Sequence, residues 1–250
     1  MFANKVVIVT GGSSGIGAAT VELFAKEGAS VAIVGRNETR LQEVAKKCEK
    51  YGATTLVIKA DVSNEEQTKT VVQKTVDKFG KLDVLVNNAG ILRFATLEQS
   101  DTLKYYDEVM NTNLRSVVQI TNLAIPHLKE TKGNIINVSS VASTSYKVAG
   151  LSAYSISKAG MDHFTRCAAV ELAPFGVRVN CVNPGPVVTE IIANANIPSD
   201  LEGKDAGQMT ALGRYSDAEE VADIILYLAS EKAKSITGVC SVIDNGYLMK

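Results

Sequence analysis

The chain is poor in the residues that build metal centres and disulfide scaffolds. Its 250 residues include four cysteines and two histidines, with no C-x-x-C pair and no Cys/His cluster. This spacing argues against a structural zinc ion and against a disulfide framework. His127 and His163 both fall in apolar helical patterns, so we expect each to be a partly buried structural residue. Scattered free thiols fit a reducing compartment, and we expect a cytoplasmic protein.

The sequence also lacks an excess of charge of one sign and any long apolar run. Lys and Arg number 26 and Asp and Glu 27, so the formal net charge is -1. We therefore expect neither a nucleic acid nor a membrane surface as a partner. No apolar run reaches the roughly 18 residues that a membrane span needs. Residues 1–10 run directly into a strand pattern, which predicts no signal peptide.

What the sequence does contain is a regular alternation of short apolar runs and amphipathic segments. Strands that are rich in Val and Ile along their whole length are typical of a parallel sheet buried on both faces. Helices between such strands indicate βαβ units. We therefore predict one α/β domain over residues 1–250, a Rossmann-type doubly wound parallel sheet of about seven strands with helices on both faces. The expected strands are residues 5–10, 30–34, 54–60, 82–86, 134–138, 177–182 and 239–243, and the expected helices are 16–28, 38–51, 65–79, 101–129, 153–172 and 217–229.

Two of these helices carry further predictions. Pro126 is expected to interrupt the helix over residues 101–129, because proline lacks the N–H that a helix interior needs. Ser63 is expected to cap the helix over residues 65–79.

Residues 184–215 form the one long stretch without strong periodicity. The stretch follows a strand directly, so it starts at the carboxyl edge of the sheet, where ligands bind in open α/β folds. We expect this segment to be a substrate loop or lid.

The first expected strand ends in a glycine-rich loop. Residues 10–17 place Gly11, Gly15 and Gly17 in G-x-x-x-G-x-G spacing between a strand and a helix. Glycines in that position let the backbone approach a pyrophosphate, whose charge the helix N-terminus stabilises. A flexible turn would explain three glycines but not their place in the strand–helix order. The loop therefore predicts a dinucleotide site.

The end of the second strand bears on which dinucleotide binds. Folds of this kind usually carry an acidic residue here, which binds the ribose hydroxyls of the adenosine. This chain instead has Gly35, Arg36 and Asn37. A guanidinium forms bidentate hydrogen bonds with a phosphate, so Arg36 favours the 2′-phosphate of NADP(H) over NAD(H). The alternative is that Arg36 is only a solvated surface residue.

Two further strand ends contribute to the same edge of the sheet. Asp61 follows the third strand and is expected to accept a hydrogen bond from the adenine amino group. Asn88, Ala89 and Gly90 follow the fourth strand and are expected to bring backbone close to the cofactor.

The chemical site is expected around Tyr154 and Lys158. Their i, i+4 spacing puts a phenol and an ammonium on one helix face, and a nearby cation lowers the pKa of a phenol. Tyr154 is thus a candidate general acid and base. Ser140, at the carboxyl end of the preceding strand, is a candidate donor to the substrate oxygen. Asn113 lies mid-helix, where asparagine is unfavourable, so it is expected to hold a water or to perturb the helix locally.

In this order the motifs resemble those of the short-chain dehydrogenase/reductase family, in its compact single-domain branch. The resemblance covers nearly the whole chain. It rests on residues 10–17, Asp61, residues 87–90, Asn113, Ser140, Tyr154 with Lys158, and residues 183–185.

The resemblance implies a role for each candidate catalytic residue. Tyr154 would donate or accept the proton, and Lys158 would bind the nicotinamide ribose and lower the pKa of Tyr154. Ser140 would polarise the carbonyl, and Asn113 would hold a water that relays protons from Lys158 to solvent. Ser139 stays open as an alternative to Ser140, because one residue more separates Ser140 from Tyr154 than in many relatives.

The resemblance also implies a homotetramer, built partly by the two long helices at residues 101–129 and 153–172. NADP(H) is the expected cofactor. NAD(H) stays open, because Ser13 and Ser14 stand where many NADP(H) relatives carry a second basic residue. No metal ligand is assigned. The residues expected to bind the cofactor are Gly11, Ser13, Ser14, Gly15, Ile16, Gly17, Arg36, Asn37, Asp61, Val62, Asn88, Ala89, Gly90, Tyr154, Lys158, Pro184, Gly185, Val187 and Thr189.

The predicted activity is hydride transfer between NADP(H) and a carbonyl or secondary alcohol. The alternative is a non-catalytic NADP(H)-binding redox sensor, which would not need Tyr154, Lys158, Ser140 and Asn113 together. The expected pocket is mainly apolar, which favours a lipophilic small molecule such as a steroid, isoprenoid, retinoid, 3-oxoacyl thioester or xenobiotic ketone. Arg93 is expected to be solvated, and the alternative is that it recognises an acidic substrate tail. The expected lining residues are Leu92, Phe94, Val148, Leu151, Ile191, Ile192, Ile197, Met209 and Leu212.

Overall fold

The strands form one sheet in which all neighbouring pairs run parallel. In the computed structural model, which describes residues 1–191, 195 and 206–250, the strand order is β3-β2-β1-β4-β5-β6-β7. The order reverses between β1 and β4. This confirms the predicted doubly wound sheet of about seven strands. The strands are β1 (Val6–Thr10), β2 (Ser30–Gly35), β3 (Thr55–Lys59), β4 (Val84–Asn87), β5 (Asn134–Val138), β6 (Arg178–Pro184) and β7 (Cys240–Ile243).

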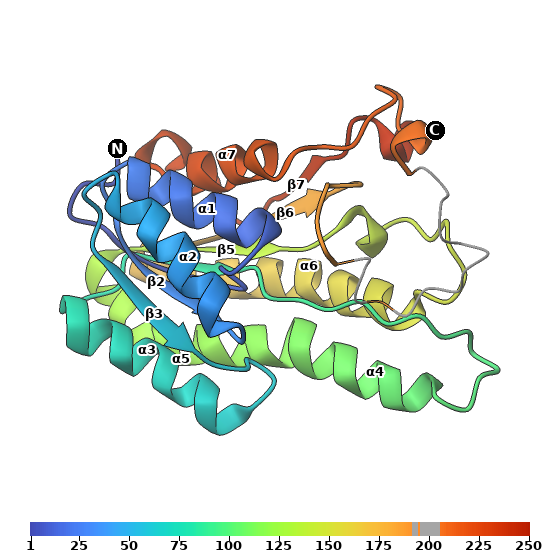
Figure 1. The fold of residues 1–250 in the computed structure, drawn as a ribbon, viewed down its shortest axis with the longest axis horizontal. Coiled ribbons are helices and arrows are strands. Elements are labelled where there is room, and N and C mark those ends of the chain that lie inside the picture. Colours follow the sequence, from blue (N-terminus) through green and yellow to red (C-terminus); the bar gives the residue numbers. More distant parts are fainter. Residues whose placement is uncertain (192–194, 196–205) are drawn as a thin grey trace.

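Helices cover both faces of the sheet, as Figure 1 shows. One face packs against α1 (Gly15–Lys26), α2 (Glu38–Glu49) and α7 (Ala218–Ala229). The opposite face packs against α3 (Glu65–Phe79), α5 (Ser116–Thr131) and α6 (Ser152–Leu172). A shorter helix, α4 (Thr102–Met110), leads into α5. Among the described residues, no helix is both long enough and apolar enough to cross a membrane.

The strand sequences explain why the sheet is buried on both sides. In β1, Val7 and Val9 belong to one apolar cluster, whereas Ile8 between them belongs to the cluster on the opposite face. All three side chains are fully buried. Each such side chain contributes roughly 1.5–3 kcal/mol to folding. An apolar residue at every position is therefore what a two-sided layer requires.

The long helix differs from its prediction. The expected break at Pro126 is wrong, because α5 runs through that residue to Thr131. Pro126 is exposed, so water can bond the carbonyl that loses its donor. The disturbance lies earlier, where Asn111–Arg115 form a π-helical turn between α4 and α5.

The cap of α3 also differs from its prediction. The Asn64 side chain, and not that of Ser63, accepts a hydrogen bond from the N–H of Gln67 at 3.0 Å. Ser63 instead donates its hydroxyl to Asp61 Oδ1 at 2.7 Å. The Ser63 side chain therefore orients Asp61, the predicted cofactor residue that follows β3.

Candidate functional site

The ends of β1 and β4 meet where the strand order reverses, and polar contacts join them. Thr10 Oγ1 accepts hydrogen bonds from the backbone N–H groups of Asn88 and Ala89, both at 3.0 Å. Asn88 Nδ2 donates to the carbonyl oxygens of Thr10 at 2.9 Å and Gly11 at 3.2 Å. The structure therefore brings the glycine loop and the loop after β4 together. Thr10 is a positioning residue that the sequence motif contained without revealing its role.

The glycines of this loop are required by close backbone approach. Gly11 has φ +66°, and a Cβ there would stand 2.8 Å from Asn88 Nδ2. A Cβ on Gly17 would stand 2.1 Å from the carbonyl oxygen of Gly11. Only glycine lets the first turn of α1 lie this close to the end of β1. The N–H groups of Gly15, Ile16 and Gly17 lie in that first turn, where helix N–H groups have no intrahelical partner and suit an anion.

The predicted adenosine end of the site lies at the ends of β2 and β3. Ser13 Oγ stands 3.4 Å from where a Cβ on Gly35 would be, so a side chain at position 35 would crowd the loop. Arg36 is 69% exposed, and its Nη1 lies 4.0 Å from Asp61 Oδ2. The guanidinium is thus near the predicted site and open to solvent.

Two residues at this end already serve the protein itself. Asn37 caps α2, because its Oδ1 accepts from the N–H of Arg40 at 3.1 Å. Val62, after β3, is 7% exposed and packs into the core. Any contact of these two residues with a cofactor would therefore come mainly from their backbone.

The segment after β6 turns toward the glycine loop. The methyl carbon of Thr189 lies 3.0 Å from where a Cβ on Gly15 would be. Arg40 of α2 forms an ion pair with Glu190. The neighbouring Val187 forms a parallel bridge with Ser216, just before α7. Thr189, one of the predicted cofactor residues of this segment, therefore lies beside the loop after β1.

The start of the segment is shaped by close packing against β7. Pro184 ends β6, and the N–H of Gly185 donates to the carbonyl oxygen of Ile243 at 2.9 Å. A Cβ on Gly185 would lie 2.7 Å from Cβ of Asp244. The glycine therefore allows the chain to leave the sheet at the carboxyl ends of these two strands.

Tyr154, Lys158 and Ser140 meet at the carboxyl end of β5. Tyr154 lies in the first turn of α6, and Lys158 one turn later. The two are 9% and 3% exposed, respectively. Lys158 Nζ donates to the carbonyl oxygen of Val138 at 2.7 Å and lies 5.6 Å from the centre of the Tyr154 ring. The predicted i, i+4 pairing therefore holds in three dimensions.

Burial controls the titration of both groups. Burial raises the pKa of the Tyr154 phenol, and a hydrogen bond with the Ser140 side chain offsets part of the rise. Burial lowers the pKa of the Lys158 ammonium to about 8. The Tyr154 pKa thus shows no net lowering, because desolvation by burial outweighs the lowering effect of the Ser140 hydrogen bond; the effect of Lys158 on this pKa stays a prediction. A phenol that keeps its proton is suited to donating it.

The geometry separates the two neighbouring serines. Ser139 is 3% exposed, and its hydroxyl donates to the carbonyl oxygen of Lys158 at 3.1 Å. The Ser140 hydroxyl accepts from the N–H of Ala142 at 3.1 Å and faces Tyr154. Ser140, rather than Ser139, is therefore placed to contact a substrate oxygen beside the phenol.

Asn113 is fully buried at the centre of the π-helical turn. Its Oδ1 accepts from the N–H of Ile91 at 2.8 Å, while its Nδ2 donates to the carbonyl oxygen of Ile91 at 2.9 Å and to Ser157 Oγ at 3.2 Å. The side chain thus joins the loop after β4 to α6. The expected local perturbation of the helix is present, since π turns occur where a helix must present a group at an irregular spacing.

The surroundings of Tyr154 are apolar on one side. Leu92 and Ala195 form a buried cluster with Tyr154, and Leu151 and Ile191 pack against it. Of the other expected lining residues, Leu212 is 67% exposed and does not line this cluster. Two more of them, Ile192 and Ile197, lie outside the described residues.

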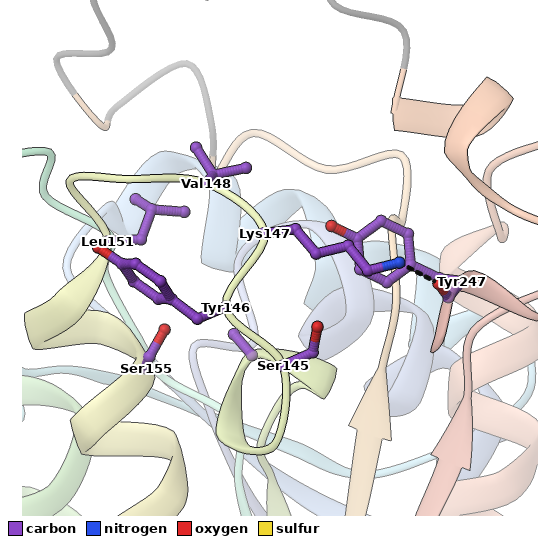
Figure 2. Close-up of a pocket in the computed structure, with 8 residues that line it drawn as sticks. Ser145, Tyr146, Lys147, Val148, Leu151, Ser155 and Tyr247 are labelled. Carbon is purple, nitrogen blue, oxygen red and sulfur yellow. Dashed lines mark hydrogen bonds between the residues drawn. The ribbon is translucent and has the colours of Figure 1, made fainter. Parts of the chain in front are cut away.

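A small pocket of about 50 Å³ lies beside this cluster (Figure 2). Val148 and Leu151 are apolar parts of its wall. The hydroxyl of Ser155 also lines the pocket and is buried without a hydrogen-bond partner in the described part of the chain. Tyr247, near the C-terminus, closes one end, where Lys147 Nζ donates to its carbonyl oxygen at 2.7 Å. The contribution of Tyr247 could not be read from the sequence, because it depends on how the C-terminal turn folds back.

Three further expectations were corrected by the structure. Arg93 is not simply solvated, since its Nε forms an ion pair with Glu108 at 2.9 Å and its side chain is 23% exposed. His127 is half-buried as predicted, but His163 is exposed on α6. The thiols are also less scattered than their spacing suggests, because Cys181 and Cys240 lie beside Asp162.

Comparisons with known proteins find similar sequences and similar folds over nearly the whole chain. The family model described as enoyl-(acyl carrier protein) reductase matches residues 11–248. The 3-oxoacyl-(acyl-carrier-protein) reductase of Thermotoga maritima is 39% identical over 247 residues, which cover 98% of each chain. The cis-4-hydroxycyclohexanecarboxylate dehydrogenase of Sinomonas cyclohexanicum is 37% identical, covering 98% of this chain and 97% of that one. A crystal structure of a short-chain dehydrogenase from Burkholderia cenocepacia in complex with NADP superposes with a TM-score of 0.91 at 35% identity, over 99% of both chains.

Proposed function

The chain belongs to the short-chain dehydrogenase/reductase family of oxidoreductases, and on that premise we propose that it reduces a carbonyl group of a lipophilic small molecule with NADPH, or oxidises the corresponding alcohol with NADP⁺. The observation that carries the proposal is the meeting of Tyr154, Ser140 and Lys158 at the end of β5. A phenol, a hydroxyl and an ammonium there lie on the same edge of the sheet as the glycine loop.

The close packing of the glycine loop is what a dinucleotide site requires. The positions where Gly11 and Gly17 would carry Cβ atoms are filled by the neighbouring backbone and by Asn88, so the loop lies tightly against β4 with the N-terminus of α1 open above it. The first turn of α1 would hold the pyrophosphate, and Lys158 would hold the nicotinamide ribose. When bound, the nicotinamide supplies the hydride or takes it up.

The chain's own residues would manage the proton and the orientation. Tyr154 donates its phenolic proton to the carbonyl oxygen in reduction and takes it back in oxidation. Ser140 donates a hydrogen bond to the same oxygen and stabilises the negative charge that develops on it. Lys158 places a positive charge beside the phenol. Asn113 keeps the loop after β4 and the start of α6 at a fixed separation.

The preference for NADP(H) rests on Arg36. Arg36 directly follows Gly35, the last residue of β2, and is exposed. No carboxylate stands there to bind the ribose hydroxyls of NAD(H). A 2′-phosphate would compete with Asp61 for the guanidinium, and a dianion at short range is the stronger partner of an exposed arginine. The NADP in the Burkholderia relative is consistent with this choice.

The substrate class is proposed from the apolar cluster around Tyr154. Leu92, Leu151 and Ile191 offer no charge to a bound molecule, so a steroid, isoprenoid, retinoid, 3-oxoacyl or xenobiotic ketone fits better than a charged sugar acid. Residues 184–215, of which 192–194 and 196–205 lie outside the described residues, are proposed as the substrate loop. The relatives include a 3-oxoacyl-(acyl-carrier-protein) reductase and a cis-4-hydroxycyclohexanecarboxylate dehydrogenase, and the first name supports the 3-oxoacyl member of this range.

The proposal includes a homotetramer in the cytoplasm. Val118 on α5 and Ile156 and Val170 on α6 are large apolar side chains that are 43%, 49% and 76% exposed, as expected for helices that pack against a second copy. The four free thiols fit a reducing compartment.

The test is a fluorescence titration with NADPH and NADH, followed by a panel of carbonyl substrates. Arg36→Ala should weaken NADPH binding at least tenfold and leave NADH binding within twofold, whereas Lys46→Ala on the exposed side of α2 should change neither. Tyr154→Phe should lower kcat by roughly 10²–10⁴-fold while NADPH still binds, and Tyr51→Phe serves as the matched control. A wild-type protein that binds NADPH but reduces no carbonyl would favour the redox-sensor alternative. Equal affinity for NADH, unchanged in Arg36→Ala, would refute the NADP(H) assignment.

A further inference from the structure

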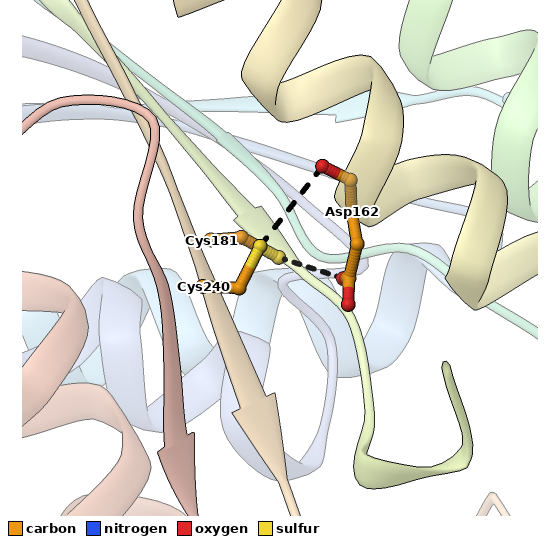
Figure 3. Close-up of side chains that lie close together, drawn as sticks. All are labelled: Asp162, Cys181 and Cys240. Atoms are coloured by element: carbon orange, nitrogen blue, oxygen red, sulfur yellow. Dashed lines mark hydrogen bonds between the residues drawn. The ribbon is translucent and has the colours of Figure 1, made fainter. Parts of the chain in front are cut away.

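Three possible metal ligands, two thiols and one carboxylate, lie close together between α6 and the strands β6 and β7 (Figure 3). Cys181 of β6 and Cys240 of β7 are register partners on neighbouring parallel strands. Asp162 reaches them from α6, one turn beyond Lys158. The Cys181 thiol lies 3.5 Å from Asp162 Oδ1 and the Cys240 thiol 3.9 Å from the Asp162 carbonyl oxygen. One ligand atom from each residue lies within 4.8 Å of the other two.

The Asp162 carboxylate interacts through space with the buried Lys158 ammonium but makes no direct contact with a positive charge in the described part of the chain. It is 4% exposed and forms no ion pair among the described residues. Its hydrogen bonds come from Asn183 Nδ2, at 3.1 and 2.9 Å to the two oxygens, and from the Cys181 thiol. Buried charges are usually paired or bound to a metal. Two thiols and one carboxylate are also a donor set that zinc accepts.

We propose that Asp162, Cys181 and Cys240 bind one soft divalent cation, such as Zn²⁺ or Cd²⁺, and that the bound ion inhibits the enzyme. Ligand atoms about 2.0–2.3 Å from a tetrahedral ion stand roughly 3.5–3.8 Å from one another. The three groups therefore need to move by about an ångström or less to form one face of such a site. Water would complete the coordination from the side of Cys240, which is the half-exposed member of the cluster.

Binding exchanges protons for the ion, with no change of oxidation state. Each thiol loses its proton to solvent and forms a sulfur–metal bond, and a carboxylate oxygen of Asp162 forms the third bond to the ion. The ion therefore competes with protons for the two thiol sulfurs. Affinity should therefore rise with pH.

We expect inhibition because Asn183, which holds Asp162, also contacts the turn that carries Ser140. Its Nδ2 also donates to the carbonyl oxygen of Ser140 at 3.2 Å and to Ser143 Oγ at 3.0 Å. An ion that draws the Asp162 carboxylate toward the thiols weakens its hold on Asn183. The turn that carries Ser140 then loses its support, so the hydroxyl beside Tyr154 is no longer fixed. This step alone rests on the proposed function, whereas binding of the ion does not.

The experiment is a titration of the metal-free full-length protein, kept reduced with a phosphine, with Cd²⁺. The thiolate-to-Cd²⁺ absorption band in the ultraviolet reports binding without any need for activity. We expect one ion per chain, with the affinity lowered at least tenfold and the band at least halved in Cys240→Ser and in Cys181→Ser. Cys167→Ser, which alters the exposed thiol of α6, should match the wild type. Cys240→Ser is the decisive variant, because its partly exposed position favours normal folding.

Each result bears on a different part of the proposal. Absence of the band, or a band that persists in Cys240→Ser and disappears in Cys167→Ser, would overturn the site. Carbonyl reductase activity should fall at least tenfold on saturation with Zn²⁺ in the wild type, and Cys240→Ser should keep its activity. Binding at the cluster with full activity retained would overturn the inhibitory role. A protein that binds Cd²⁺ as expected but reduces no carbonyl would refute the proposed function and leave the site intact.

Discussion

Asn113 offers the sharpest test of how the site is held together. Asn113→Ala removes three hydrogen bonds, to the N–H and carbonyl oxygen of Ile91 and to Ser157 Oγ. A net hydrogen bond contributes about 0.5–1.5 kcal/mol, and a buried group left without its partner costs about 1–3 kcal/mol. Since water can reach the half-buried Ile91 in part, we expect the free energy of unfolding to fall by about 2–4 kcal/mol.

The measurement is urea unfolding followed by circular dichroism at fixed protein concentration. Asn111→Ala is the matched control, because Asn111 begins the same π turn but its side chain is exposed. We expect it to change the free energy of unfolding by less than about 0.5 kcal/mol. The reasoning is refuted if the two variants are equally stable, which would mean that the amide of Asn113 does not join the loop after β4 to α6.

Three further predictions concern the cofactor loop and the catalytic helix. Gly17→Ala should weaken NADPH binding at least tenfold, because its Cβ would stand 2.1 Å from the Gly11 carbonyl oxygen; an unchanged affinity in a fluorescence titration would contradict this. Ser140→Ala should lower kcat by about 10²–10³-fold, whereas Ser139→Ala should mainly cost stability; steady-state kinetics showing the reverse order would reassign the serine. Lys158 has a folded pKa of about 8, below its ordinary value, so the unfolded chain binds the extra proton and the ammonium destabilises the fold below pH 8. The stability of the wild type relative to Lys158→Met should therefore rise between pH 8 and about 10.5, and a flat difference in urea midpoints would argue against the buried ammonium.

Much of the fold could be predicted because its causes are local. Strands such as β1 carry Val or Ile at nearly every position, and this pattern suits a layer that is covered on both faces. Helix and strand boundaries were mostly within two or three residues of their predicted places. The errors at Pro126 and Ser63 arose where solvent exposure and a neighbouring asparagine decided the outcome, and neither is visible in a short sequence window.

The membership of the candidate site stays a prediction from the sequence, whereas the contacts among its residues come from the structure. The order of the glycine loop, Asn113, Ser140 and the Tyr154–Lys158 pair along the chain predicted a site at the carboxyl edge of the sheet, and the structure places Ser140 and the Tyr154–Lys158 pair close together there. The pKa shifts of Tyr154 and Lys158 were not predictable, because they come from burial, to which residues distant in sequence contribute, such as Leu92 beside Tyr154. The choice between Ser139 and Ser140 depended in the same way on which hydroxyl the backbone of Lys158 engages.

The sequence by itself determined the alternation of strands and helices, the glycines that must lie at the first turn and the residue types at the catalytic position. These features follow from side-chain volume, backbone freedom and helix periodicity, all of which act over a few residues. Only the tertiary structure placed Cys181 beside Cys240 and Asp162, because strand order and register bring together residues that are 59 positions apart in the chain. Burial then shifted the pKa values of Tyr154 and Lys158. The polarity around a side chain depends on the atoms packed against it, and many of these come from residues distant in sequence.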